Sequence, residues 1–327
     1  MIDTVSKTSW RNQDALLLEN ETIRIIVVPH IGAKLVSLFD KRSGREWLVD
    51  SGDRPLKPIP YGASFVEQDM SGWDEMFPTI VPCSYPAPGT RSGVHLPDHG
   101  EVWALPWTIE AATSRALQLS VDGVALPYRL TRTLSFIAHD GLEMHYKVVN
   151  LGEEPMPYIW AAHPQFVCSE GAEIRFPPAI REVCNTIPAE WGWGEPESRF
   201  DWPEAINPRG RRVRLDQVGP PSLQQGRKFF TLPDARPGWA GLIRQPHADW
   251  LRLEWDPERV PYLSVWVDEG ALSHESVVAL EPTTGFYDSL EVAWNKGLVT
   301  ILEPGETQTW TLRVRLGTGE QPFPPDS

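Results

Sequence analysis

The chain has 327 residues, a hydrophobic fraction of 41%, and a formal net charge of −14 from 30 basic and 44 acidic residues. This composition supports a sizeable folded core, and such an acidic surface argues against nucleic acid and anionic membranes as partners. No apolar run suits a secretion signal or a membrane span, so we expect a cytoplasmic protein. The 3 cysteines are widely spaced and form no CxxC pair, which argues against a disulfide scaffold.

Short alternating or apolar runs separated by turn residues predict an all-β protein. The segments with strand character are 23–28, 34–39, 117–121, 129–137, 142–148, 251–255, 262–267, 276–280 and 307–316. The 32 prolines are spread along the chain and disfavour long helices. One short helix is predicted at 288–296, with Asp288 as its N-cap and Gly297 after its end.

We expect a single domain over residues 1–327. The segment 170–237 is rich in Pro, Gly, Arg and Glu and poor in strand patterning. It is therefore predicted to be a loop-rich excursion from one large sandwich. Residues 317–327 are predicted to form a disordered tail. The sequence gives no indication of the oligomeric state.

Two strand ends carry candidate acid and base groups. Glu281 follows the run 276–280 and precedes Pro282. Burial at such a place raises a carboxyl pKa towards the range of a general base. His163 ends an apolar segment, and the proline after it favours an extended conformation. A histidine pKa near neutrality suits proton transfer.

Aromatic and polar side chains near these strand ends are candidate sugar contacts. The chain has 15 tryptophans, and an aromatic face packs well on the apolar C–H face of a pyranose. Two adjacent carboxylates beside a tryptophan, at 73–75, suit hydrogen bonds from sugar hydroxyls. The residues expected to bind substrate are His99, Trp73, Asp74, Glu75, Trp103, Gln165 and Trp266.

A metal site is an alternative for one of these loops. His95, His99 and Glu101 share parity, so on a strand they would lie on one face and offer metal ligands. Pro97 interrupts that strand, and no HExxH motif is present in the sequence. The sequence keeps open a metal-dependent sugar isomerase that uses these three residues.

Taken in order, these segments resemble the aldose 1-epimerase (galactose mutarotase-like) superfamily. The landmarks are 29–33, 73–78, 98–103, 162–166, 280–282 and 302–306. The resemblance implies a large antiparallel β-supersandwich with a carbohydrate cleft on its concave face. It further implies Glu281 as general base, His163 as general acid and His99 as a second pocket histidine, with no metal or cofactor.

The sequence departs from the superfamily pattern in three places, one of which is the segment 170–237, which matches nothing in that pattern. No arginine-containing sugar-binding motif is found near 73–78, and Pro164 and Gln165 follow the candidate acid where a large polar residue is usual. A non-catalytic sugar-binding or sensing protein on the same scaffold therefore stays open beside the enzyme. The identity of the sugar and the presence of a phosphate or acid group on it also stay open.

Overall fold

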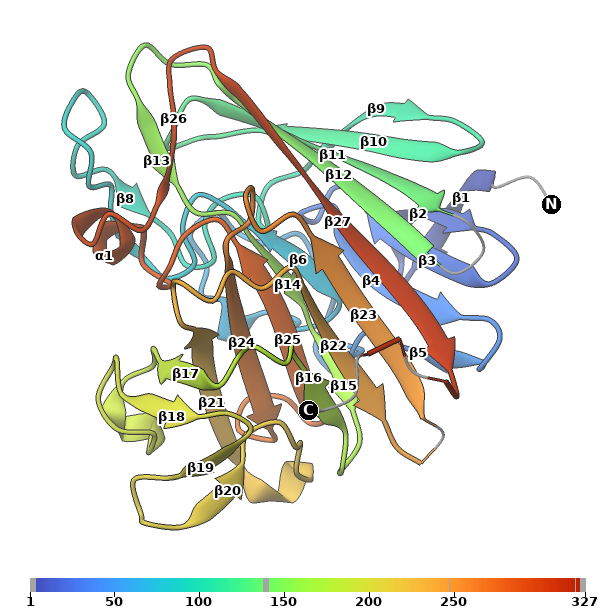
Figure 1. The fold of residues 1–327 in the computed structure, drawn as a ribbon. Helices are drawn as coiled ribbons and strands as arrows, with labels where there is room; N and C mark the ends of the chain where they lie inside the picture. The colour runs from blue at the N-terminus through green and yellow to red at the C-terminus, as the bar shows by residue number, and fades with distance from the viewer. Residues whose placement is uncertain (1–3, 138–140, 247, 321, 324–327) are drawn as a thin grey trace.

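The computed structural model describes residues 4–137, 141–246, 248–320 and 322–323, and two large antiparallel sheets dominate it (Figure 1). The first sheet has the strand order β1 (Thr4–Trp10), β2 (Gln13–Glu19), β3 (Ile23–Val28), β4 (Lys34–Asp40), β6 (Trp73–Met76), β14 (Ala161–Pro164), β25 (Ser276–Thr283), β24 (Tyr262–Glu269), β21 (Gln225–Thr231), β17 (Glu182–Asn185) and β18 (Arg199–Asp201). Two further strands pair with this sheet off the main path: β5 (Arg45–Glu46) beside β4, and β15 (Phe166–Cys168) beside β25.

The second sheet packs against the first. Its strand order is β16 (Glu173–Arg175), β22 (Trp239–Arg244), β23 (Asp249–Trp255), β27 (Thr307–Thr318), β12 (Gly141–Asn150), β11 (Tyr128–Ile137), β10 (Ala116–Asp122) and β9 (Thr108–Ala112). Three two-stranded pairs complete the strands: β13 (Met156–Tyr158) with β26 (Thr300–Leu302), β19 (Glu204–Ile206) with β20 (Arg212–Arg214), and β7 (Cys83–Ser84) with β8 (His95–Leu96). Every segment predicted to be a strand lies in one, which confirms the all-β prediction.

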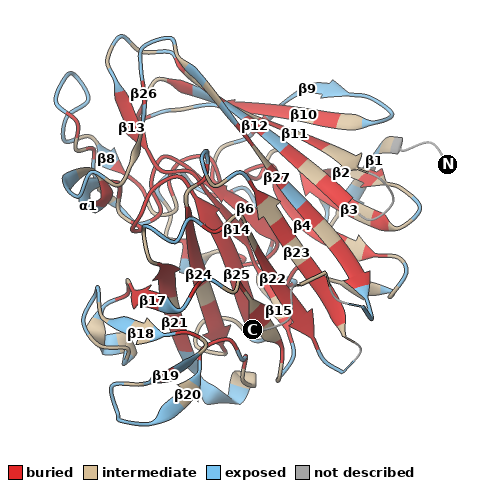
Figure 2. Ribbon diagram, viewed as in Figure 1, coloured by how far each residue is buried: buried red, intermediate tan, exposed pale blue. Residues whose placement is uncertain are grey.

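Alternation along the strands builds the core between the sheets. On β25, Val278 and Leu280 are fully buried and belong to the same apolar cluster as Leu263 of β24. Met144 and Leu312 bring the second sheet into that cluster. Figure 2 shows the buried positions running along the central strands of both sheets. Burying one such side chain stabilises the fold by about 1.5–3 kcal/mol, so this face of each strand is fixed by packing.

The segment 170–237 is more regular than the sequence suggests. Its strand β21 lies inside the first sheet, hydrogen-bonded to β24, and β17 and β18 extend the same sheet beyond it. Its strand β16 joins the second sheet. The segment therefore contributes strands to both large sheets.

The C-terminal strand and the short helix also differ from their predicted bounds. β27 runs through Thr318, two residues into the stretch expected to be disordered, and Phe323 stacks on Trp239 with ring centroids 5.5 Å apart. Residues 321 and 324–327 of that stretch lie outside the described residues. The helix α1 (Leu290–Asn295) is capped by Ser289, which accepts a hydrogen bond from Val292 N at 3.4 Å.

The described part of the chain forms three short 3-10 turns: η1 (Phe65–Glu67), η2 (Ala189–Trp191) and η3 (Pro221–Leu223). Within the described residues, α1 spans six residues, and no helix there combines the length and apolar character needed to cross a bilayer.

Candidate active site

One face of the first sheet brings the candidate acid and base together. The antiparallel register pairs Ala161 of β14 with Thr283 of β25, so two residues further His163 lies opposite Glu281. On its other side His163 pairs with Asp74 of β6. Side chains on adjacent paired positions share a face, whereas Leu280, next to Glu281, points into the core. Thus three chain segments that are far apart in sequence place their polar groups side by side.

The candidate pair is close and buried. Nε2 of His163 lies 3.8 Å from Oε1 of Glu281, and the two residues are 5% and 0% exposed. Among the described residues, Nδ1 of His163 and Oε1 of Glu281 have no hydrogen-bond partner, whereas Oε2 of Glu281 is paired with Lys228. Buried polar atoms are usually satisfied, so hydroxyl groups of a ligand would find free acceptors and donors here.

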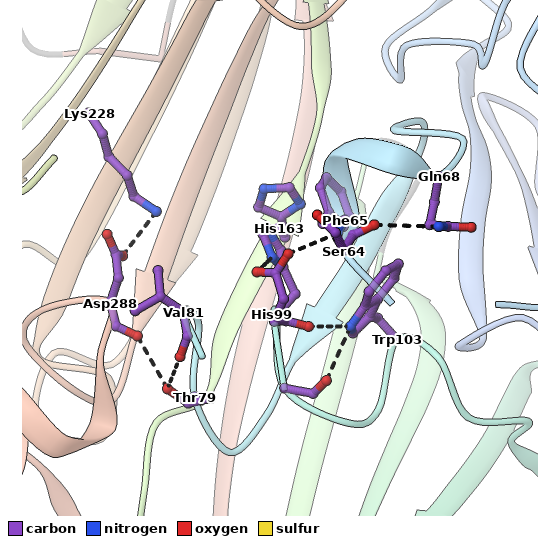
Figure 3. Close-up of polar contacts among 12 residues, drawn as sticks. Ser64, Phe65, Gln68, Thr79, Val81, His99, Trp103, His163, Lys228 and Asp288 are labelled. Carbon is purple, nitrogen blue, oxygen red and sulfur yellow. Dashed lines mark hydrogen bonds and ion pairs between the residues drawn. The ribbon is translucent and has the colours of Figure 1, made fainter. Parts of the chain in front are cut away.

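Lys228 is the residue of this site that the sequence reasoning missed. Its Nζ lies 3.0 Å from Oε2 of Glu281, and its side chain is 10% exposed. The same Nζ lies 2.9 Å from Oδ1 of Asp288 (Figure 3). Burial alone would lower the pKa of Lys228, but the two carboxylates outweigh it and raise that pKa. Lys228 is therefore a fixed cation at neutral pH. Asp288, predicted as the N-cap of α1, lies one residue before the actual cap Ser289.

The surroundings move the pKa values of the acid and base in opposite directions. Burial raises the pKa of Glu281, and the nearby Lys228 opposes that rise only in part. Burial, with the positive charges of His99, Lys228 and Lys34, lowers the pKa of His163 well below its usual range. In the free protein at neutral pH His163 is therefore neutral, and Glu281 holds a proton more readily than it would in water.

A second buried lysine lies on the other side of His163. Nζ of Lys34 is 2.6 Å from Oδ2 of Asp69 and 3.1 Å from Oδ2 of Asp74, and all three residues are buried. Burial raises the pKa of Asp74 to about 6, against the opposing effect of Lys34. Each lysine of the site thus contacts two carboxyl groups.

Aromatic rings cover the second pocket histidine. His99 follows Pro97 and Asp98 in a loop, and Phe65 of η1 stacks on it with centroids 4.0 Å apart and planes 8° apart (Figure 3). The rings of His99 and His163 lie 5.0 Å apart at 83°. Asp98 fixes this cluster, because its carboxylate contacts Nδ1 of His99 at 2.7 Å and accepts a hydrogen bond from Phe65 N at 2.8 Å.

Two of the expected substrate contacts point to the other face of β6. Glu75 accepts hydrogen bonds of 2.8 Å from Arg132, Tyr146 and Trp160, all within the core. Trp73 is fully buried beside Phe166, with centroids 5.9 Å apart. Because side chains alternate along a strand, Trp73 and Glu75 point away from the face on which Asp74 lies beside His163. Neither side chain is therefore placed to contact a sugar on that face.

The remaining expected contacts lie nearer the pair. Trp103 is buried behind the ring cluster, 5.2 Å from Phe65, and its Nε1 donates to the carbonyl of Asp98 at 2.8 Å. Gln165 is buried two residues after His163, and its Nε2 has no partner among the described residues. Trp266 is half-buried and pairs with Lys228 across β24 and β21.

Replacing Glu75 with Gln is expected to destabilise the fold without changing the chemistry. Arg132 would lose its buried counter-charge, which costs roughly 3–5 kcal/mol in the free energy of unfolding. Urea unfolding measures this loss, and catalytic assays at a temperature where the variant is folded should give wild-type values. An unchanged unfolding free energy together with a raised KM would instead make Glu75 a substrate contact.

The alternative metal site is not formed. Oε1 of Glu101 accepts hydrogen bonds from Tyr61 Oη at 2.7 Å and Ala125 N at 2.6 Å, and Oε2 accepts one from Tyr128 Oη at 3.0 Å. His95 is exposed on β8. In the described part of the chain no group of three His, Cys, Asp or Glu residues is placed to hold a metal ion. The described structure therefore gives no support to the alternative in which His95, His99 and Glu101 share a metal.

Comparison with known structures places the fold. The chain is similar to a galactose mutarotase-like protein from Lactobacillus casei ATCC 334, with a TM-score of 0.68, 19% identity, and coverage of 93% of this chain and 100% of that one. It is also similar to a galactose mutarotase related enzyme from Lactobacillus acidophilus, with a TM-score of 0.66, 14% identity, and coverage of 93% and 97%. A galactose mutarotase-like protein from Clostridium acetobutylicum is similar with a TM-score of 0.65 and 14% identity, and the match covers 97% of this chain and 99% of that one.

No curated protein matches the sequence. The family described as aldose 1-epimerase matches residues 14–179, which is 166 of the 327 residues and includes Asp74, His99 and His163. The structural neighbours extend the same fold over β21 and β25, where Lys228 and Glu281 lie. The chain belongs to the aldose 1-epimerase family.

Proposed function

We propose that this protein interconverts the anomers of a free aldose by acid–base opening and closing of the sugar ring. The observation that carries the proposal is the His163–Glu281 pair, buried on one sheet face with 3.8 Å between its nearest nitrogen and oxygen. Proton transfer at two places on one sugar requires two such groups within reach of adjacent atoms.

In the proposed reaction Glu281 accepts the proton of the anomeric hydroxyl while the bond between C1 and the ring oxygen breaks. His163 gives a proton to that ring oxygen. The open-chain aldehyde then rotates about the C1–C2 bond, and reclosure on the other face of C1 reverses both transfers. The pair ends with the proton count with which it began, so it needs no further reactant.

The directions of the pKa shifts bear on which of the two groups holds a proton before the reaction. The reactive form needs Glu281 ionised and His163 protonated, whereas burial favours the proton on Glu281 and a neutral His163. Burial therefore works against the reactive form in the free protein. Lys228 acts on both groups, because its positive charge at 3.0 Å stabilises the ionised Glu281 and also disfavours the protonated His163.

Replacing Lys228 with Met is expected to move the pH profile of kcat/KM to higher pH. Loss of the cation removes a charge that lowers the pKa values of both Glu281 and His163, and removing such a partner shifts a pKa by roughly 1–3 units. Rates of anomer exchange between pH 4 and pH 8.5 measure the shift. Lys228→Arg, which keeps the charge, serves as the control and should move the profile less. A profile unmoved in Lys228→Met would remove Lys228 from the mechanism.

The proposed function is tested by anomer exchange on a panel of aldoses, measured by NMR saturation transfer or polarimetry with the spontaneous rate subtracted. Acceleration of at least one aldose is the expected result. Titration calorimetry with the same sugars runs in parallel. Saturable binding without acceleration would overturn the enzyme in favour of a sugar-binding protein on this scaffold.

A further inference from the structure

A separate cavity of about 500 Å³ lies where the excursion meets β21. Residues of the loops and the strand share its lining. They include Trp191, Trp193, Asn207, Arg209, Gln225 and Gly226. No role in ring opening falls to any of these residues, so the cavity needs its own explanation.

Two indole rings form a corner beside this cavity. The rings of Trp191 and Trp266 meet edge to face, with centroids 5.3 Å apart and planes at 85°. Gly226 makes the room for them, because a Cβ at that position would lie 2.6 Å from Trp266 and 2.7 Å from Trp191. Both tryptophans remain partly exposed, so each still offers aromatic surface to a ligand.

The chemistry of the lining suits a neutral ligand with many hydroxyls. Asn207 Oδ1 accepts hydrogen bonds from the backbone N–H groups of Arg209 and Arg211, and Gln225 Nε2 donates one to Glu269 at 2.7 Å. The amide nitrogen of Asn207 and the amide oxygen of Gln225 therefore offer a donor and an acceptor to a ligand next to the aromatic surface. The charged side chains of the lining are one acidic residue, Glu190, and one basic residue, Arg209. A carbohydrate fits this combination of flat apolar faces and amides better than an anion or a lipid does.

The strand register connects this cavity to the active site. Gly226 and Lys228 lie two residues apart on β21 and so share a face, and Lys228 pairs with Trp266. On the next pair of strands Ser264 lies opposite Glu281, again on that face. Glu281 lies two strands across from Phe230, which is four residues beyond Gly226 on β21. The usual rise per residue and spacing between strands therefore put Gly226 about 16 Å from Glu281. A single pyranose is too short to reach both places.

We propose that the tryptophan corner is a subsite for the remote units of a reducing oligosaccharide whose terminal ring opens at the His163–Glu281 pair. This inference rests on the proposed function for the position of the reducing end. Trp191 and Trp266 pack on sugar faces, and Asn207 and Gln225 bind hydroxyl groups. The excursion thus extends a monosaccharide site into an oligosaccharide cleft.

The test compares anomer exchange of glucose and galactose with that of maltotriose, cellotriose, laminaritriose and galactotriose. At least one trisaccharide should have a kcat/KM about tenfold above that of its monosaccharide. Trp191→Ala should remove this advantage and leave the monosaccharide values unchanged, whereas Trp191→Phe should keep part of it. Trp239→Ala, at a half-buried tryptophan of the second sheet, is the matched control and should change neither.

A separate binding measurement distinguishes failure of the subsite from failure of the proposed function. Calorimetry with the same trisaccharides uses the wild type and Trp191→Ala. If monosaccharides exchange but no trisaccharide reacts faster or binds more tightly than its monosaccharide, the subsite is overturned and the proposed function stands. If no sugar exchanges while Trp191→Ala still abolishes tight trisaccharide binding, the subsite stands and the proposed function fails.

Discussion

Replacing Glu281 with Gln is expected to lower kcat for anomer exchange by about 10²–10⁴-fold. The amide keeps the shape of the side chain but accepts no proton from the anomeric hydroxyl. KM should change little, because hydrogen bonding to the sugar is largely preserved, and a fall in kcat at constant KM marks an interaction made in the transition state. Saturation-transfer NMR at several sugar concentrations separates the two constants.

Folding of this variant has to be measured beside its rate, since Glu281 is fully buried and contacts Lys228. Lys228 keeps Asp288 as a counter-charge in the variant, so we expect a cooperative thermal transition. Glu275→Gln, at an exposed glutamate just before the same strand, is the matched control and should retain the wild-type rate. A fully active Glu281→Gln protein with native unfolding would end the assignment of Glu281 as base.

The strands and their ends could be predicted from the sequence because both depend on local patterns of apolar and turn residues. Segments 276–280 and 262–267 are apolar runs bounded by turn residues, and each lies in a strand of the first sheet. Glu281 and His163 were found because each closes such a run. Their proximity depends on the pairing of β14 with β25, a contact across more than 100 residues that no local pattern contains.

Lys228 could not be found for the same reason. It lies in β21, where Arg227 and Lys228 interrupt the apolar residues and make the strand read as a polar loop. Both charges are satisfied by distant partners: Arg227 by Glu269 at 2.8 Å and Lys228 by Glu281. A buried strand that carries paired charges loses the hydrophobic signature by which strands are recognised.

The pair Asp74 and Glu75 shows a limit of a different kind. The sequence analysis expected both to bind a sugar, but residues 73–76 form the strand β6, on which neighbouring side chains point to opposite faces. Which residue faces the cleft is decided by Arg132 and Tyr146, which approach Glu75 from the second sheet. Core hydrogen bonds to Glu75 thus leave Asp74 on the face that carries His163.

Replacing His163 with Ala is expected to lower kcat by about 10²–10⁴-fold, since the ring oxygen then leaves C1 without a proton donor. His163→Gln, which can donate a hydrogen bond but transfers no proton, should lose as much. The comparison matters because the ring of His163 also packs 4.9 Å from Phe65, and Ala alone would change the packing and the proton donor together.

His145→Ala, at an exposed histidine of β12, is the matched control and should behave as the wild type. Added imidazole should restore part of the rate of His163→Ala and none of the rate of Glu281→Gln, because only the former has lost an imidazole and gained space for one. If His163→Gln were as fast as the wild type, hydrogen bonding alone would account for the role of His163, and proton transfer to the ring oxygen would have to come from water.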